Sequence, residues 1–258
     1  MPAGTPAIID MNAIYILWLR QLKRYLRSRA RLIGSLGQPI LFLVALGFGF
    51  GPIYAKAGGG NYIQFLTPGI IAMTVLFSSI FTGIDIIWDR QFGFLKETLV
   101  APVSRISIMI GRTLGGATVA TMQGTLVFFI SLIAGFRPVD WRYLPVVLLI
   151  MFVIALLFTA LGTAIASVLS DFQGFQLIMN FLVMPLFFLS GALFPLQGLP
   201  IAVTAIAMVD PLSYGVDALR AVLLQTAHFG LMLDLTVLLS CVIVLTALGA
   251  FLFSRSEV

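Results

Sequence analysis

Long apolar runs alternate with short polar stretches along this chain, and the alternation predicts helices that cross a membrane. Six runs each approach or exceed the ~20 residues that a helix needs to cross a hydrocarbon core about 30 Å thick. Unbroken apolar runs favour helices over a membrane barrel, whose strands alternate in polarity over about ten residues. The runs cover residues 32–50, 65–87, 106–136, 144–169, 175–194 and 231–253.

Residues 11–31 precede the first run and have two distinct faces. On a helical wheel the cations fall on one arc and the apolar side chains on the opposite arc. A basic amphipathic helix with aromatic residues on its apolar face is typical of a helix that lies in the membrane interface. A disordered basic tail is the alternative. The apolar arc holds Ile14, Tyr15, Trp18, Leu22, Tyr25 and Leu26, and the basic arc holds Arg20, Lys23, Arg24, Arg27 and Arg31.

Residues 195–230, between the fifth and sixth runs, are too apolar for a solvated loop. Pro195, Pro200 and Pro211 divide this segment, and two short helices are expected over residues 201–208 and 212–224. Apolar helices too short to cross a membrane are typical of re-entrant or interfacial elements. We therefore expect an all-α integral membrane protein with an interfacial N-terminal helix, six transmembrane helices and a re-entrant helical pair between the fifth and the sixth. These elements form one domain over residues 1–258.

Small residues along the third and fourth runs predict close helix contacts. Gly111 and Gly115 have the spacing of a small-residue packing motif. Gly116 and Gly124 follow on the third run, and Gly162 lies on the fourth.

A polar island, WDRQFGFLKETLVAPVSR over residues 88–105, interrupts the apolar pattern. An amphipathic helix is expected over residues 91–100, ended by Pro102. Its apolar side chains Phe92, Leu95 and Leu99 recur at spacings of three and four. Such a helix between two membrane spans suggests that a partner docks there. A plain interfacial helix lying on the membrane is the alternative.

Composition and charge agree with a membrane protein and suggest its orientation. Hydrophobic residues make up 60% of the chain and charged residues only 10%, whereas soluble domains carry about 25% charged residues. The net charge of +5 comes from cations next to apolar runs, so orientation and anionic lipid explain it better than nucleic acid. The positive-inside rule places both termini and residues 88–105 in the cytoplasm.

The sequence carries no energy source or catalytic site that we recognise. None of Lys23, Lys56 and Lys96 follows a glycine, so there is no phosphate-binding P-loop. His228 is the only histidine and Cys241 the only cysteine, so no zinc motif and no bound cofactor is expected. The central part of every apolar run is uncharged, which argues against ion coupling. A passive channel or scaffold, and a membrane hydrolase that uses His228, are the alternatives to a transporter driven by a partner.

Two segments resemble the permease subunits of type-2 ABC exporters. The closest likeness is to the daunorubicin-resistance type of drug and lipid exporters, with polysaccharide and nodulation-factor exporters as the nearest sister group. The first segment carries Leu99, Pro102, Val103, Ser104, Arg105, Gly111 and Arg112. The second carries Leu186, Leu189, Ser190, Ala192, Leu199 and Pro200, followed by Pro211, Leu212, Ser213, Tyr214 and Arg220.

The resemblance implies partners, location and cargo. Two cytoplasmic ABC ATPase subunits would bind ATP and Mg, and a second permease chain, in a homodimer, would complete the pathway in a prokaryotic plasma membrane. The cargo would be hydrophobic or amphipathic, such as a drug or lipid, and would leave the cytoplasm or the inner leaflet. Export of a polysaccharide or lipo-oligosaccharide by the same architecture is the alternative. Membrane lipids are further partners, and nucleic acid is not.

Three groups of residues are expected to carry this function. Arg90, Phe92, Leu95, Lys96, Glu97, Leu99, Pro102 and Arg105 would couple the permease to the ATPase. Pro211, Ser213, Tyr214, Asp217 and Arg220 would form an outer gate or a structural plug, with Tyr214 at the water–lipid boundary and Asp217 paired to Arg220 on one helix. Phe181, Phe187, Phe188 and Phe194 would line the substrate path, unless they are ordinary core or lipid-facing residues.

Overall fold

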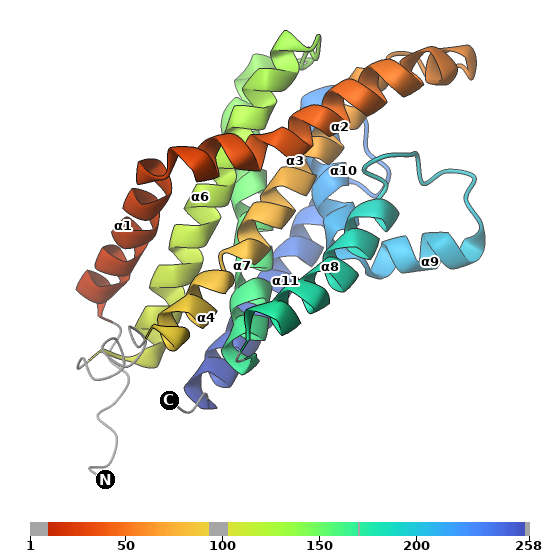
Figure 1. Cartoon of the computed structure of the whole chain (residues 1–258). Helices are drawn as coiled ribbons and strands as arrows, with labels where there is room; N and C mark the ends of the chain where they lie inside the picture. Colours follow the sequence, from red (N-terminus) through yellow and green to blue (C-terminus); the bar gives the residue numbers. More distant parts are fainter. Residues whose placement is uncertain (1–9, 93–102, 170, 256–258) are drawn as a thin grey trace.

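The computed structural model describes residues 10–92, 103–169 and 171–255, and these ranges are all-helical, with no β-strand among them (Figure 1). Side chains at residues 30, 31, 105 and 253–255 are not described. The helices are α1 (Met11–Arg27), α2 (Arg29–Lys56), α3 (Tyr62–Phe81), α4 (Ile84–Gln91), α6 (Arg105–Ile133), the 3₁₀ turn η1 (Trp141–Tyr143), α7 (Leu144–Val168), α8 (Phe172–Leu189), α9 (Ile201–Val209), α10 (Pro211–Leu224) and α11 (Leu231–Arg255).

Each of the six predicted apolar runs contains a helix long and apolar enough to cross a membrane, which confirms the predicted fold class. The first, second and fifth spans differ most from the predicted runs, and the fifth, α8, ends at Leu189 instead of residue 194. α2 continues through Pro39 and Pro52 to Lys56. The second span, Tyr62–Gln91, is made of α3 and α4, and it breaks at Thr82 and Gly83.

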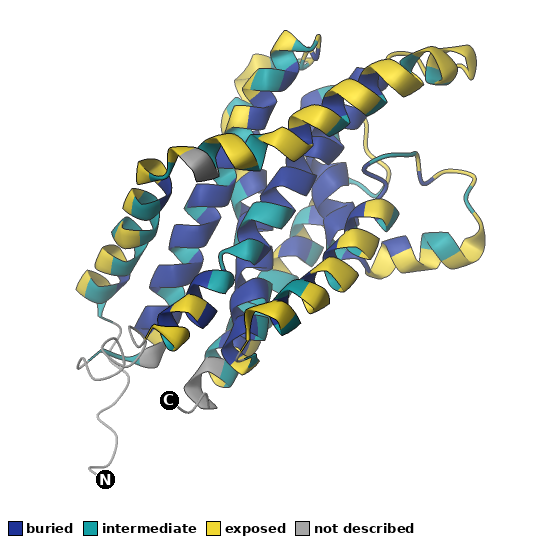
Figure 2. Ribbon diagram, viewed as in Figure 1, coloured by how far each residue is buried: buried dark blue, intermediate teal, exposed yellow. Residues whose placement is uncertain are grey.

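α3, α6 and α7 form the centre of the bundle (Figure 2). In the second span, 72% of the most apolar window is buried, compared with 17% for α2, 22% for α8 and 11% for α11. These three outer helices therefore keep apolar faces that the protomer does not cover, as expected for helices in contact with lipid or another chain.

The predicted small-residue contacts are confirmed, and they explain how the central helices approach so closely. A Cβ atom on Gly162 would lie 2.5 Å from the Ile80 carbonyl oxygen of α3. A Cβ on Gly69 would lie 2.4 Å from the Ala192 carbonyl oxygen, beyond the end of α8. The Gly162 and Gly69 contacts are to backbone, whereas a Cβ on Gly124 of α6 would lie 2.7 Å from a side-chain methyl group of Val75 of α3. Only glycine fits at such backbone contacts.

The predicted amphipathic helix is present as α1, and it packs along the first half of α6. Gly111 and Gly115 lie against Ile14, Leu17 and Gln21, and a Cβ at Gly115 would lie 2.8 Å from the Cβ of Gln21. Nearby, the Trp18 indole Nε1 donates to Thr118 Oγ1 over 3.0 Å. The apolar arc is therefore divided: Tyr25 is buried by the protein, whereas Tyr15 and Leu26 are exposed.

The helical pair expected between the fifth and sixth spans is also confirmed. α9 and α10 meet at an angle of 85°. Pro211 is the first residue of α10, and the Asp210 carboxylate caps that helix by accepting from the Leu212 N–H. α10 is buried among α3, α7 and α11, whereas α9 projects from the side of the bundle and buries only Ala207 (Figure 1).

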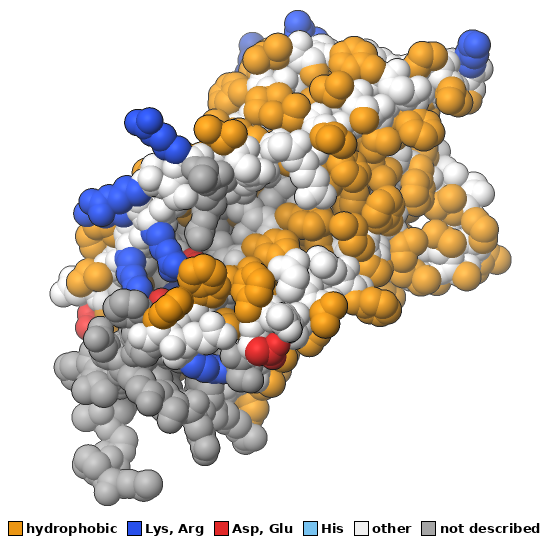
Figure 3. Space-filling model, viewed as in Figure 1, with side chains coloured by type: hydrophobic (Ala, Val, Ile, Leu, Met, Phe, Trp, Pro, Cys, Tyr) orange, Lys and Arg blue, Asp and Glu red, His pale blue; other side chains and the backbone are white. Residues whose placement is uncertain are grey.

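Two ends of the bundle matter for the functional site. α1 begins, α4 ends, α6 begins and α11 ends at one end, which we call the α4–α6 end (Figure 1). α2 ends and α3 begins at the opposite end. Hydrophobic side chains cover much of the visible face between the two, and cations gather around α1 (Figure 3).

Candidate functional site

The polar island at residues 88–105 begins inside α4. The helix continues to Gln91 and Phe92 terminates it. The rings of Trp88 and Phe92 lie 5.9 Å apart and are exposed, at 43% and 67%. An aromatic pair is therefore exposed where the chain leaves the bundle.

Most of the predicted coupling helix lies outside the described residues, so the coupling assignment stays a prediction. Gln91, its expected first residue, is the last residue of α4. Arg105 is the first residue of α6, whose N-terminus is capped by the Ser104 hydroxyl. The remaining coupling residues, Leu95, Lys96, Glu97, Leu99 and Pro102, fall in the part of the chain that is not described.

Arg90, predicted to be a coupling residue, ties α4 to the end of α7. Its guanidinium donates to the carbonyl oxygens of Ser167 (2.8 Å) and Leu169 (2.9 Å). The last carbonyls of a helix have no partner within the helix, and a cation there also suits the helix dipole. Movement of α4 would therefore act directly on α7.

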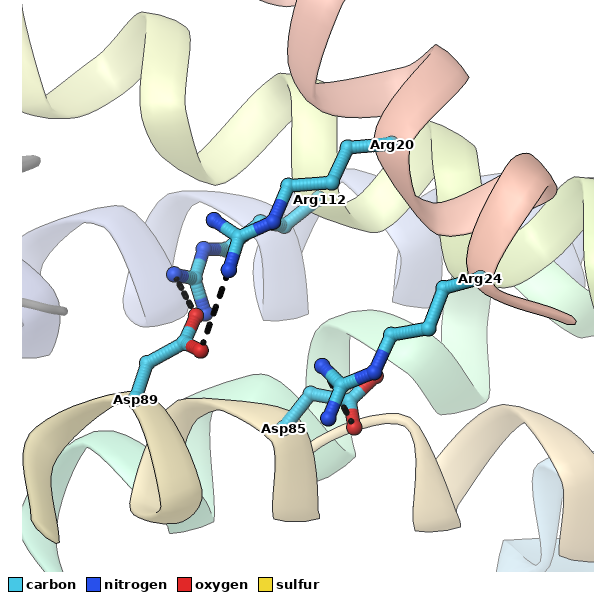
Figure 4. A network of polar contacts seen from close by, with 5 residues as sticks. All are labelled: Arg20, Arg24, Asp85, Asp89 and Arg112. Atoms are coloured by element: carbon cyan, nitrogen blue, oxygen red, sulfur yellow. Dashed lines mark hydrogen bonds and ion pairs between the residues drawn. The ribbon is translucent and has the colours of Figure 1, made fainter. Parts of the chain in front are cut away.

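Two carboxylates and three guanidinium groups join α1, α4 and α6, and we call Arg20, Arg24, Asp85, Asp89 and Arg112 the charged cluster (Figure 4). Arg24 lies 3.2 Å from Asp85, and Arg20 lies 3.3 Å from Asp89. Arg112 of α6 donates to the other oxygen of Asp89.

Three of the five members of the charged cluster are buried, whereas the side chains of Arg20 and Arg24 are 45% and 34% exposed. Asp85, Asp89 and Arg112 are 4%, 5% and 4% exposed. Three cations face two anions, so the cluster keeps one excess positive charge. Each buried ion depends on its partner, because removing one member of a buried pair leaves an uncompensated charge and costs about 3–5 kcal/mol. The cluster therefore holds α1 and α6 to α4.

Sequence reasoning named Arg112 only as part of the family resemblance and missed the charged cluster as a whole. The spacing of the charged residues along the sequence already indicated this cluster. Asp85 and Asp89 are four apart, as are Arg20 and Arg24, and residues four apart lie on the same face of a helix. Two matched acidic and basic faces could have been paired before the structure was known.

The predicted outer gate residues are brought together near the start of α10, within the protein. Tyr214 is only 9% exposed. Its hydroxyl donates to the Met208 carbonyl over 2.7 Å, and its ring lies 4.9 Å from that of Phe229. Protein therefore surrounds the Tyr214 ring and satisfies its hydroxyl, whereas its expected position at the water–lipid boundary stays a prediction. Ser213 is buried beside it.

The predicted Asp217–Arg220 ion pair is also wrong: the described residues contain no ion pair between them. Asp217 accepts from the backbone N–H groups of His228 (2.8 Å) and Phe229 (2.7 Å), which precede α11. Backbone groups near helix ends lack helical partners and compete for the carboxylate.

Arg220 contacts two backbone carbonyl groups and an aromatic ring instead of Asp217. It donates to the carbonyl oxygens of Gly191 (3.0 Å) and Phe65 (3.4 Å), and its guanidinium carbon lies 4.1 Å from the centre of the Phe65 ring. One side chain of α10 thus holds both the start of α3 and the turn after α8. A planar guanidinium with several donors suits this role better than a lysine.

The four phenylalanines predicted to line the path do not share one surface. Phe187 is buried and lies 6.0 Å from the Phe42 ring of α2. Phe181 and Phe188 are 86% and 42% exposed on α8, and Phe194 is half-buried after that helix. Phe181 lines an apolar groove of about 720 Å³ between α8 and α9, together with Leu177, Pro185 and Ile206.

Among the described residues, no group of three or more His, Cys, Asp or Glu side chains is arranged to hold a metal ion. His228 packs its ring on Phe229, and its backbone N–H bonds to Asp217.

Comparison with known proteins gives the chain its family. Residues 12–224 match the family of ABC-2 type transporters. The chain is 27% identical over 227 residues to Nodulation protein J of Rhizobium leguminosarum bv. viciae, covering 87% of this chain and 85% of that protein. It is 30% identical over 216 residues to the putative transport permease ycf38 of Pyropia yezoensis, covering 81% and 73%. The chain therefore belongs to the ABC-2 type transporter family, as a membrane-embedded permease subunit.

Proposed function

We propose that this chain forms the transmembrane pathway of an exporter driven by separate ABC ATPase subunits that dock on residues 88–105. Membership of the ABC-2 family implies such an ATPase partner. The observation that carries the proposal is the set of polar contacts made by α4, the helix that leads into this segment. The positive-inside rule supports placing the segment in the cytoplasm.

Polar contacts link α4 to three other helices. Asp85 and Asp89 hold α1 and α6, and Arg90 holds the end of α7. A displacement of the coupling segment would therefore move several helices together. Such a chain of ion pairs and hydrogen bonds is a physical route for coupling, which variants along it can test.

A second copy of the chain would complete the pathway. α2 and α8 are in contact through Phe42 and Phe187, and both helices keep apolar surface that the protomer does not cover. Phe181 and Phe188 on the exposed face of α8 would then face the partner protomer or the pathway. The proposed assembly is a homodimer with two ATPase subunits in a prokaryotic plasma membrane.

Two classes of cargo remain for the exporter. An apolar pathway suits a hydrophobic or amphipathic molecule, such as a drug or lipid. The similarity to proteins named Nodulation protein J supports the sister group that exports polysaccharides or lipo-oligosaccharides at least as well as the daunorubicin-resistance group.

Co-purification with the ABC ATPase partner that the family implies tests the docking site. Leu99→Asp places a charge on the apolar face of the expected coupling helix, and Glu97→Arg reverses a charge at its rim. Both variants should reduce ATPase binding at least tenfold, about 1.4 kcal/mol, while the permease still folds. Lys56→Glu, at the opposite end of the bundle, is the matched control and should bind normally. Normal ATPase binding by both variants would refute the docking site.

A further inference from the structure

A cavity of about 370 Å³, lined by both apolar and polar side chains, lies between α2, α3 and α6. It reaches from Asp85, in the charged cluster, to Gln123 in the interior of α6. Its volume falls in the range of about 300–1,000 Å³ that is typical of small-molecule sites. Gly34 and Gln38 of α2 are exposed and form its rim, so the cavity opens beside α2.

Three helices each contribute a neutral polar side chain that has no partner in the described part of the chain. Gln38 comes from α2, Ser78 from α3 and Gln123 from α6. Gln123 is only 5% exposed. Polar side chains in membrane helices normally bond to one another, whereas these three line the cavity, where a ligand could bond to them. Their convergence on one cavity indicates that something else satisfies them.

The remaining lining indicates what kind of group fits. Phe77 and Phe81 are stacked, with ring centres 6.3 Å apart, and both line the wall. The only carboxylate in the lining, Asp85, is paired to Arg24 at 3.2 Å. Aromatic surface beside the Gln38 and Gln123 amides and the Ser78 hydroxyl, with no unpaired charge, suits an uncharged ligand that both donates and accepts hydrogen bonds.

We infer that this cavity binds the uncharged polyhydroxyl head, such as a sugar ring, of an amphipathic cargo. The apolar part of that cargo would remain in the bilayer beside α2, where the cavity opens. The inference rests on the proposed function and narrows its cargo to molecules that carry such a head. A sugar attached to a lipid and a free oligosaccharide share this chemistry.

Protection of an introduced thiol tests the inference. The reporter is Gly34→Cys in a Cys241→Ala background, because Gly34 lies on the exposed rim and an added Cβ meets nothing within 4 Å. The chain is placed in lipid nanodiscs without ATPase or ATP, and labelling by N-ethylmaleimide is followed. Dodecyl maltoside, below its micelle-forming concentration, should slow labelling, and dodecyl phosphocholine, with the same alkyl chain and a charged head, should not.

Variants on α6 locate the binding group. Gln123→Leu should raise the half-protecting concentration of dodecyl maltoside about five- to tenfold, because one or two hydrogen bonds are lost. Gln123→Asn, which keeps an amide, should have a smaller effect. Thr125→Val is the matched control: it removes a hydroxyl from the same helix outside the cavity lining, and should leave protection unchanged.

The outcomes distinguish a soluble sugar from a lipid-linked sugar, and they test the cavity separately from the proposed docking site. If free maltose protects at the same concentration as dodecyl maltoside, the site binds a soluble sugar. If free maltose protects only at a far higher concentration, the site binds a lipid-linked sugar. Both results support a polyhydroxyl site. Absent protection, equal protection by dodecyl phosphocholine, or an unchanged Gln123→Leu variant would overturn the inference. The thiol-protection experiment contains no ATPase, so its failure would not affect the co-purification test of the docking site. Failure of the co-purification test would likewise not affect thiol protection.

Discussion

At the scale of single residues, Asp89 is the carboxylate of the charged cluster that pairs with two arginines. It accepts from Arg20 and from the buried Arg112. Asp89→Asn would leave Arg112 without its counter-ion, and we expect a loss of about 3–5 kcal/mol in the free energy of unfolding. Thermal or denaturant unfolding in nanodiscs measures the loss.

Two further variants make this result specific. Asp171→Asn is the control, because Asp171 is an exposed helix cap and asparagine caps equally well. The double variant Asp89→Asn/Arg112→Gln should lose less stability than the sum of its single variants, because it removes both charges. Additive losses, or equal losses in Asp89→Asn and Asp171→Asn, would show that Asp89 and Arg112 do not depend on each other.

Residue roles were harder to predict than residue positions. Pro211 was correctly expected to begin a helix, because proline suits the first helical position. The partners of Asp217 and Arg220 were not predictable from spacing, because backbone groups from α3, the turn after α8 and the segment before α11 compete for them. Those groups come close only when the bundle is assembled.

At the scale of elements, Arg220 holds α10 to the start of α3 and to the turn after α8. Arg220→Met removes hydrogen bonds from a charged group to the Phe65 and Gly191 carbonyls, each worth about 1.5–3 kcal/mol. We expect faster amide hydrogen exchange in α10 and at the start of α3. Arg220→Lys should recover only part of the protection, because an ammonium group lacks the planar fork.

The control for this prediction lies at the same end of the bundle. Arg142→Met changes an arginine that is exposed on η1 and should leave exchange in α10 unchanged. Unchanged exchange in Arg220→Met as well would mean that packing alone holds α10.

Helix packing in the centre of the bundle gives a second prediction at this scale. Gly162→Ala would place a methyl group 2.5 Å from the Ile80 carbonyl oxygen and should destabilise the fold by about 1–3 kcal/mol. Gly49 lies on α2, and a Cβ added there would meet no atom within 4 Å. Gly49→Ala should therefore be neutral or slightly stabilising. Comparison of the two melting temperatures checks this, and similar values would contradict the close α3–α7 contact.

Element positions were largely predictable because lipid imposes a strong and simple pattern. All six spans, and the short helices α9 and α10, follow from run length and proline positions. The break at Gly83 was not predictable, because it depends on the close approach of the Gly162 backbone. The contact of α1 with α6 was only hinted at by the spacing of Gly111 and Gly115.

At the scale of the whole molecule, the charged cluster and the Arg90 contacts make the α4–α6 end the place where force from an ATPase would be distributed. Toward the opposite end, Arg220 holds α10 to the start of α3 and to the turn after α8. The cavity at Gln123 lies between these two regions. This arrangement supports the proposal of a pathway whose loading and opening depend on a partner.

ATP-dependent transport in reconstituted vesicles tests that description most directly. The chain is incorporated with its ABC ATPase partner, and movement of a fluorescent amphipathic lipid across the bilayer is followed with ATP, without ATP, and with Leu99→Asp. Transport should require ATP and should fall at least tenfold in Leu99→Asp. Equal flux in the absence of ATP, or full ATP-driven flux in Leu99→Asp, would contradict a permease driven through residues 88–105.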